Sequence, residues 1–313
     1  MKLAFDIFRL LRPRQWIKNF AILASVLFAG KLFDIEILGK IIPSFFVFCA
    51  LSSAIYIVND IFDLEKDKLH PSKKYRPLAH GDVPIPLALL IAVIFSVFSL
   101  FVGSLVTPAF FLSIIVYLIL QISYSVFLKN IAVIDILAIA AGYMLRVYAG
   151  ELASGLRISV WLLLTAISLS LFLAVGKRRS ELTLISKYSK AQIELTRKSL
   201  SHYSERLLDV YASVFATSTF ITYSLFTFLE NPSGFKPSFG LFMPEFLPAF
   251  FQRKWLMITI IPVVYGLMRY MQDIYEKHEG ESPEKVLLSD IALLITVALW
   301  GILVIGIIYF IGA

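Results

Sequence analysis

The stretch YIVNDIFDLEKDKLHPSKKYRPLAHG, residues 56–81, begins inside a long apolar run and ends in a dense cluster of charges. Four acidic residues fall within eight positions, and lysines, an arginine and two prolines follow them. A helix that crosses a bilayer needs about 20 mostly apolar residues, and the run before the charges is that long. The stretch therefore predicts a membrane helix that ends at a polar site.

Composition supports a membrane protein along the whole chain. The 313 residues are 58% hydrophobic and only 16% charged, whereas soluble domains are about 25% charged. We expect an all-α integral membrane protein with one membrane-embedded domain over residues 1–313. The net charge of +7 is explained by basic loops on one side of the membrane, so it does not indicate a nucleic-acid partner. The single cysteine, Cys49, gives no indication of disulfides.

Hydropathy predicts nine spans, and the basic residues orient them. The loops and termini predicted for one side hold 21 of the 29 Lys and Arg residues, and those for the other side hold 6. The positive-inside rule then predicts a multi-pass protein of the inner (plasma) membrane with a cytoplasmic N-terminus. Residues 1–15 form an amphipathic segment that we expect at the membrane surface. The spans are 16–34, 42–62, 85–106, 109–128, 131–150, 158–176, 208–229, 255–271 and 288–310.

The acidic residues of the opening stretch have helical spacing. If the helix continues through Asp67, then Asp60, Asp63 and Asp67 share one face, with Asn59 and Tyr56 beside them. Three stacked carboxylates repel one another, and a cation must offset them. Mg²⁺ fits, since it prefers carboxylate oxygens and binds substrate phosphates. The competing interpretation is a solvated loop in which Asp and Lys pair at the surface.

This pattern resembles the first aspartate-rich motif of the UbiA superfamily of intramembrane prenyltransferases. RPRQW at residues 12–16 and RPLAHG at residues 76–81 are similar to two further signatures of these proteins. The resemblance covers essentially the whole chain. It implies nine transmembrane helices around a central cavity that opens to the cytoplasm, with the active site on that side.

One motif of the superfamily is replaced. Where an ordinary member carries a second aspartate-rich motif, residues 176–182 read GKRRSEL. This block, together with residues 12–19, 56–77, 143–150 and 197–200, resembles the decaprenyl-phosphate phosphoribosyltransferase branch. The resemblance implies Mg²⁺-dependent transfer of 5-phosphoribosyl from phosphoribosyl diphosphate (PRPP) to a polyprenyl phosphate, with release of diphosphate. It also implies a place in the pathway to arabinan and cell-wall sugar donors.

The resemblance also implies roles for single residues. Asn59 joins the three aspartates as a catalytic residue, and the aspartates hold the metal. For Lys177 and Glu181 an ordinary i, i+4 pair is the alternative. For Arg146 the alternative is a structural contact with Glu151 or with a helix carbonyl. Asp135 could pair with Lys129. The predicted substrate-phosphate residues are Lys18, Tyr56, Lys73, Lys74, Arg76, Arg146, Lys177, Arg178 and Glu181.

Two other functions remain open. The first is a UbiA-type prenyltransferase that joins a prenyl diphosphate to an aromatic acceptor, against which the missing second aspartate motif argues. The second is a transporter with a charged cytoplasmic rim, although few charges fall within the spans and no paired broken helices are evident. A homo-oligomer is compatible with the sequence, which indicates nothing about its size.

Overall fold

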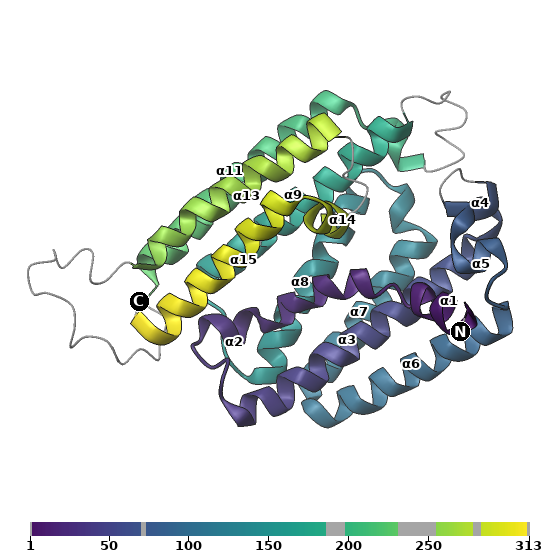
Figure 1. The fold of residues 1–313 in the computed structure, drawn as a ribbon, viewed down its shortest axis with the longest axis horizontal. Coiled ribbons are helices and arrows are strands. Elements are labelled where there is room, and N and C mark those ends of the chain that lie inside the picture. The colour runs from purple at the N-terminus through teal and green to yellow at the C-terminus, as the bar shows by residue number, and fades with distance from the viewer. Residues whose placement is uncertain (1, 70–72, 186–197, 231–254, 278–282, 312–313) are drawn as a thin grey trace, which may run out of the picture.

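The computed structural model describes residues 2–69, 73–185, 198–230, 255–277 and 283–311, and in these parts the chain is helical. Seven helices are long and apolar enough to cross a membrane, and each corresponds to a predicted span. The bundle is therefore confirmed as all-helical (Figure 1). The seven are α3 (Ile35–Phe62), α6 (Ile85–Val106), α7 (Pro108–Val126), α8 (Ile134–Ser154), α9 (Val160–Ile185), α11 (Glu205–Leu229) and α15 (Ile291–Gly306), which continues into the π-helix η7 (Ile307–Ile311).

The other two predicted spans are helical but divided. Residues 16–34 contain most of the 3₁₀-helix η1 (Pro13–Leu23) and all of α2 (Ala24–Phe28), and residues 255–271 contain η5 (Trp255–Thr259) and most of α13 (Ile260–Gln272). The second break lies just before Pro262, which has no N–H to donate and so weakens the preceding turn. A 3₁₀ segment as long as η1 is unusual and often marks a functional region.

Packing places η1 against two long helices. It contacts α3 and α8, while α9 packs on α11 and α8, and α3 packs on α6. Figure 1 shows α11, α13 and α15 along one side of the bundle and α3, α6 and α7 along the other. A Cβ at Gly150 of α8 would lie 1.9 Å from the Ile22 carbonyl oxygen of η1, so glycine is required for this close approach.

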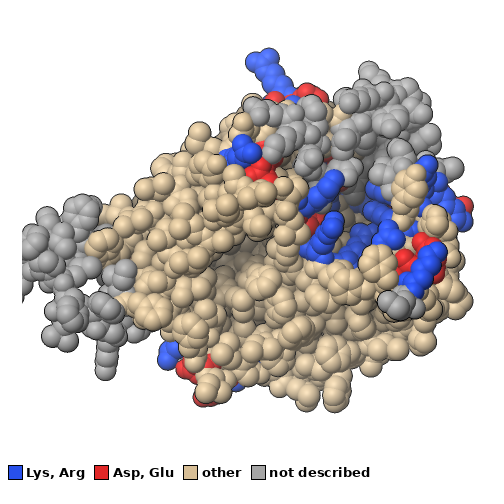
Figure 2. Space-filling view, in the orientation of Figure 1, with Lys and Arg blue, Asp and Glu red and all other residues tan. Residues whose placement is uncertain are grey.

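Short polar elements join the long helices. Figure 2 shows the largest group of Lys and Arg side chains on the side that carries α1, α4 and α5, and a hollow in the apolar face near the middle of the view. Helix α1 exposes Phe5 and Phe8, an arrangement that suits the predicted interfacial segment. These elements are α1 (Lys2–Leu10), α4 (Leu64–Leu69), η2 (Lys73–Tyr75), α5 (Pro77–His80), η3 (Leu128–Asn130), η4 (Lys198–His202), the π-helix η6 (Asp273–Lys277) and α14 (Pro283–Ser289).

Candidate active site

The predicted aspartate face is broken at its middle residue. Helix α3 ends at Phe62, Asp63 has non-helical dihedral angles, and α4 begins at Leu64. The expectation of one continuous helix through Asp67 is therefore wrong. Asp63 turns toward Lys129, whose Nζ lies 3.4 Å from its carboxylate, whereas Asp60 and Asp67 are buried elsewhere, at 4% exposure each.

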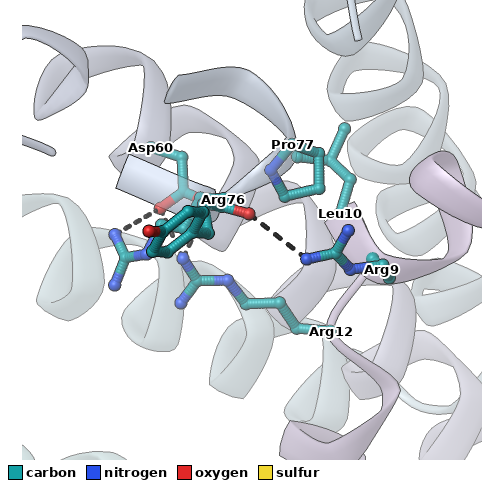
Figure 3. A pocket seen from close by; sticks show the side chains of 7 residues that line it. Arg9, Leu10, Arg12, Asp60, Arg76 and Pro77 are labelled. Carbon is teal, nitrogen blue, oxygen red and sulfur yellow. Dashed lines mark hydrogen bonds and ion pairs between the residues drawn. The ribbon is translucent and has the colours of Figure 1, made fainter. Parts of the chain in front are cut away.

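Two arginines hold Asp60 and Asp67 together. Arg12 Nη2 lies 2.5 and 2.7 Å from the two carboxylate oxygens of Asp60. Arg76 Nη1 lies 3.0 Å from Asp60 and 2.5 Å from Asp67. Figure 3 shows Arg12, Arg76 and Asp60 pointing toward one another, with Arg9 beside them. We call Arg12, Asp60, Asp67 and Arg76 the aspartate group.

A cavity of about 310 Å³ opens at the aspartate group. Its volume is at the lower end of the range for small-molecule sites, which is about 300–1,000 Å³. Three arginines and one aspartate give its walls a net positive charge, which favours an anionic ligand. The lining residues are Arg9, Leu10, Arg12, Asp60, Tyr75, Arg76 and Pro77.

The aspartate group fits a divalent cation once Arg76 moves. Within the described part of the chain no three His, Cys, Asp or Glu side chains are arranged to hold a metal ion. However, a single cationic nitrogen of Arg76 already lies within 3.0 Å of both Asp60 and Asp67. Carboxylate oxygens that converge on one cation are the donors that Mg²⁺ prefers. The Arg76 side chain is 29% exposed on a short connecting segment, so a metal ion at this point would have to displace it.

A second polar group joins η1, α3 and α14. Lys18 Nζ lies 2.6 Å from Gln15 Oε1 and 3.0 Å from Glu284 Oε2. The Tyr56 hydroxyl donates to the same Gln15 oxygen at 3.0 Å, and Gln15 Nε2 donates to Glu284 Oε1. We call Gln15, Lys18, Tyr56 and Glu284 the lysine group. Helix α14 supplies its only carboxylate among the described residues.

The electrostatics of the lysine group keep Glu284 ionised. Burial would raise the pKa of the Glu284 carboxyl, but Lys18 and Lys177 outweigh burial and hold that pKa below its ordinary value. Lys177 is half-buried on α9, the helix against which α14 packs. The ring of Tyr56 connects the two groups, because the Arg12 guanidinium lies 5.0 Å from its centroid. The lysine group thus adjoins the aspartate group.

Comparison with known proteins identifies the family. Residues 19–295 match the UbiA prenyltransferase family. The chain belongs to this family. The decaprenyl-phosphate phosphoribosyltransferase of Mycobacterium tuberculosis is 34% identical over 95% of this chain and 92% of its own length. The protein of that name from Corynebacterium glutamicum is 34% identical over 98% of this chain and 88% of its own length.

The fold agrees with solved members of the UbiA family. A UbiA homolog from Archaeoglobus fulgidus bound to GPP and Mg²⁺ aligns with a TM-score of 0.67 and 19% identity, covering 96% of this chain and 100% of that chain. A digeranylgeranylglyceryl phosphate synthase structure aligns with a TM-score of 0.63 and 15% identity, covering 98% of this chain and 100% of that chain. At these identities the likeness shows the UbiA fold and nothing more specific.

In the basic block at residues 176–182, Arg178 is fully buried, whereas Lys177 is half-buried. The Nε of Arg178 lies 2.7 Å from Asp135, and Arg178 also contacts Glu181 and the Tyr124 hydroxyl. Arg178 and Glu181 thus belong to one ion-pair network, and their contact with a substrate phosphate stays a prediction. A buried arginine demands such partners. The proposed contact of Glu181 with Lys177 gives way to Arg178.

Two alternative pairings are also corrected. Asp135 binds Arg178, Ser199 and Tyr203 rather than Lys129. Arg146, only 5% exposed, donates to Asn19 at 2.8 Å, to the Tyr117 hydroxyl at 2.6 Å and to the Gly142 carbonyl at 2.5 Å. The predicted alternative contact of Arg146 with a helix carbonyl is therefore confirmed at Gly142, whereas the one with Glu151 is not, because Glu151 accepts from the Ile158 N–H.

The remaining predicted residues lie near the aspartate group in sequence. Asn59 is half-buried, and its backbone carbonyl accepts from the Asp63 N–H. Lys73 and Lys74 belong to η2, and Lys74 is exposed over the Tyr75 ring at 5.1 Å. Residues 70–72, predicted as part of the cationic loop, lie outside the described residues, as does Arg197 of the block at 197–200. Nothing in these contacts assigns Asn59, Lys73 or Lys74 a role.

Sequence reasoning missed three members of the two groups. Arg12 was recognised only as part of a signature, Gln15 was not singled out, and Glu284 lies in a loop more than 200 residues from the aspartates. Gln15 stands in the RPRQW block and could have been found there. Glu284 follows a proline at the start of a short helix, a common position for a capping acid, so no sequence signal distinguishes it.

Proposed function

We propose that this protein transfers 5-phosphoribosyl from PRPP to a polyprenyl phosphate and releases diphosphate. The observation that carries the proposal is 34% identity, over nearly the full chain, to proteins named decaprenyl-phosphate phosphoribosyltransferase. The two charged groups agree with such substrates. PRPP carries a diphosphate and a phosphomonoester on one ribose, and the aspartate and lysine groups lie side by side.

The aspartate group would receive the diphosphate. Asp60, Asp67 and the nearby Asp63 would hold Mg²⁺, which when bound neutralises charge on the diphosphate as it leaves. Arg12 and Arg76 face the same cavity and can donate to the diphosphate oxygens once Asp60 and Asp67 engage the metal. Arg76 would then exchange a carboxylate for a phosphate.

The chemistry needs little proton transfer from the protein. An oxygen of the polyprenyl phosphate attacks C1 of the ribose, a new C1–O bond forms, and the bond to the diphosphate breaks. The nucleophile is already ionised at neutral pH, so no strong general base is required. Positively charged side chains stabilise the charges of both substrates, and their positions set the line of attack.

The same proposal extends to the membrane and the pathway. The bias of Lys and Arg supports a plasma-membrane protein whose active site faces the cytoplasm, where PRPP is made. The divided segments at 13–28 and 255–272 would complete nine spans around a central cavity. The product would be a lipid-linked phosphoribose on the way to arabinan donors of the cell wall.

A direct assay tests the proposed reaction. Protein purified in detergent is incubated with labelled PRPP, polyprenyl phosphate and Mg²⁺, and the lipid fraction is counted. We expect labelled lipid that disappears on chelation of the metal. Absence of labelled lipid, together with prenylation of an aromatic acid from a prenyl diphosphate, would establish the alternative UbiA-type activity instead.

A further inference from the structure

Glu284 has no role in the proposed reaction, yet it is placed like a functional residue. It lies on α14, the short link before the last membrane helix, and is only 4% exposed. Helix α14 packs against η1 and α9, the two segments that carry Lys18 and Lys177, and the Glu284 carboxylate contacts Gln15 and Lys18 of η1. A buried carboxylate is costly unless cations and hydrogen bonds compensate it.

The contacts of Glu284 fix the direction of Lys18. The ammonium of Lys18 has three N–H donors. Lys18 Nζ donates to Gln15 Oε1 at 2.6 Å and forms an ion pair with Glu284 Oε2 at 3.0 Å. The Lys18 side chain keeps 14% exposure, so its ammonium is within reach of a bound substrate.

The side chains around Glu284 carry a net positive charge, which favours binding of an anion. Lys18 and Lys177 carry two positive charges, and Glu284 supplies one negative charge among the described residues that act on this group. Tyr56 and Tyr143 are the other titratable side chains that face Lys18, whose Nζ lies 5.9 Å from the Tyr143 ring centroid.

We propose that Glu284 is a positioning residue that, with Gln15, holds charged Lys18 so that Lys18 and Lys177 bind a phosphomonoester of a substrate. The inference rests on the proposed function and refines it. It assigns the phosphomonoester to the lysine group and leaves the diphosphate with the aspartate group. The 5-phosphate of PRPP and the phosphate of the lipid share this chemistry, and the experiment separates them.

The first test is a double-mutant cycle on the Michaelis constants. Glu284→Gln keeps the shape of the side chain and removes its charge. We expect the KM for one substrate, PRPP or polyprenyl phosphate, to rise about ten-fold, with kcat within about three-fold of the wild type. In a Lys18→Met background the same substitution should have little further effect, because Glu284 acts through Lys18. The substrate whose KM rises is the one that the lysine group binds.

Matched variants keep the outcome interpretable. Glu284→Asp, which retains the charge, should recover most of the affinity. Glu36→Gln removes a carboxylate that is 84% exposed at the far end of α3 and should change neither KM. The inference is overturned if Glu284→Gln leaves both KM values unchanged or raises both equally, or if its effect is undiminished in the Lys18→Met background.

A binding measurement separates this inference from the reaction itself. Without Mg²⁺, ribose 5-phosphate or polyprenyl phosphate should raise the thermal unfolding midpoint of the wild-type protein, and Glu284→Gln should reduce that rise. If the wild type binds one of these ligands but forms no phosphoribosyl lipid, the proposed reaction fails and the phosphate subsite stands. If it forms the lipid and Glu284→Gln binds both ligands normally, only the role of Glu284 fails.

Discussion

One guanidinium nitrogen of Arg12 contacts both carboxylate oxygens of Asp60, at 2.5 and 2.7 Å. The contact joins the segment before η1 to the end of α3, 48 residues later in the chain. Arg12 has a φ of 53° in the left-handed region, a backbone conformation that is unfavourable for a residue with a Cβ. The ion pair helps to hold this turn, and under the proposed function a metal ion would compete with Arg12 for Asp60.

Asp60→Asn should therefore reduce transfer by more than about 100-fold in kcat/KM. The change removes a charge that the metal and both arginines use, and interactions that stabilise charge in a transition state are worth about this much. Initial rates with labelled PRPP at saturating Mg²⁺ measure the effect. Asp63→Asn should be similarly impaired if Asp63 leaves Lys129 to join the metal.

The control for these variants is Glu65→Gln in the same acidic run. The Glu65 side chain is 82% exposed and pairs only with Lys68 among its described contacts, and such surface pairs contribute about 0–1 kcal/mol. We expect wild-type rates from this variant. A fully active Asp60→Asn protein would contradict the assignment of Asp60 to the metal.

Arg76→Gln should act in opposite directions on metal and substrate. Because the guanidinium lies between Asp60 and Asp67, its removal frees their oxygens, and half-maximal activity should need several-fold less Mg²⁺. The KM for PRPP should rise about ten-fold, since a charge-assisted contact to the diphosphate is lost. Paired titrations of Mg²⁺ and PRPP test both effects, and a higher Mg²⁺ requirement would contradict the exchange of Arg76 between carboxylate and phosphate.

Contacts between residues of the candidate site were predictable from the sequence where the residues lie close together in the chain. The spacing of Asp60 and Asp67 within one short stretch predicted that these carboxylates share a face, and they do converge, on Arg76, although the helix between them is broken. The break at Asp63 could not be predicted, because the partner of Asp63 there is Lys129 of η3, which follows α7 more than 60 residues later in the chain. The environment of Arg178 could not be predicted either. An arginine is a common phosphate ligand, but Arg178 is fully buried beside Asp135, a residue distant in sequence.

Single alanine substitutions of Lys177 and Arg178 should have different effects, one on the KM of a phosphate substrate and the other on stability. Arg178→Ala leaves the buried Asp135 without its arginine, and loss of one partner of a buried pair costs about 3–5 kcal/mol. We expect a markedly lower unfolding midpoint in detergent. Lys177→Ala removes a half-buried cation and should leave the midpoint near wild type while raising the KM of a phosphate substrate.

Neighbouring positions make these two variants controls for each other. The same helix, α9, carries both, and the alanine is equally compatible with it. Equal losses of stability, or an unchanged KM in Lys177→Ala, would show that the whole basic block serves the fold rather than substrate binding.

The acid stability of the protein should depend on Glu284. Its pKa is lowered in the folded state by Lys18 and Lys177 against the effect of burial, so its contribution is present above the unfolded pKa of about 4.3. That contribution is lost as the pH falls from there through the folded pKa. The unfolding midpoint of the wild type should exceed that of Glu284→Gln at pH 7, and the difference should shrink below about pH 4.5. A difference that stays constant with pH would contradict the ionised state of Glu284.

Gly150→Ala should disturb the lysine group from a distance. The added Cβ would lie 1.9 Å from the Ile22 carbonyl oxygen, which is backbone and cannot rotate away, so η1 must shift from α8. Overpacking of this kind costs about 1–3 kcal/mol, and the shift moves Gln15 and Lys18, which η1 carries. We expect a lower unfolding midpoint and reduced transfer. Gly39→Ala, where a Cβ meets nothing within 4 Å inside α3, should be neutral or slightly stabilising because alanine is the better helix former. Equal behaviour of the two variants would mean that the approach of η1 to α8 is not what positions the site.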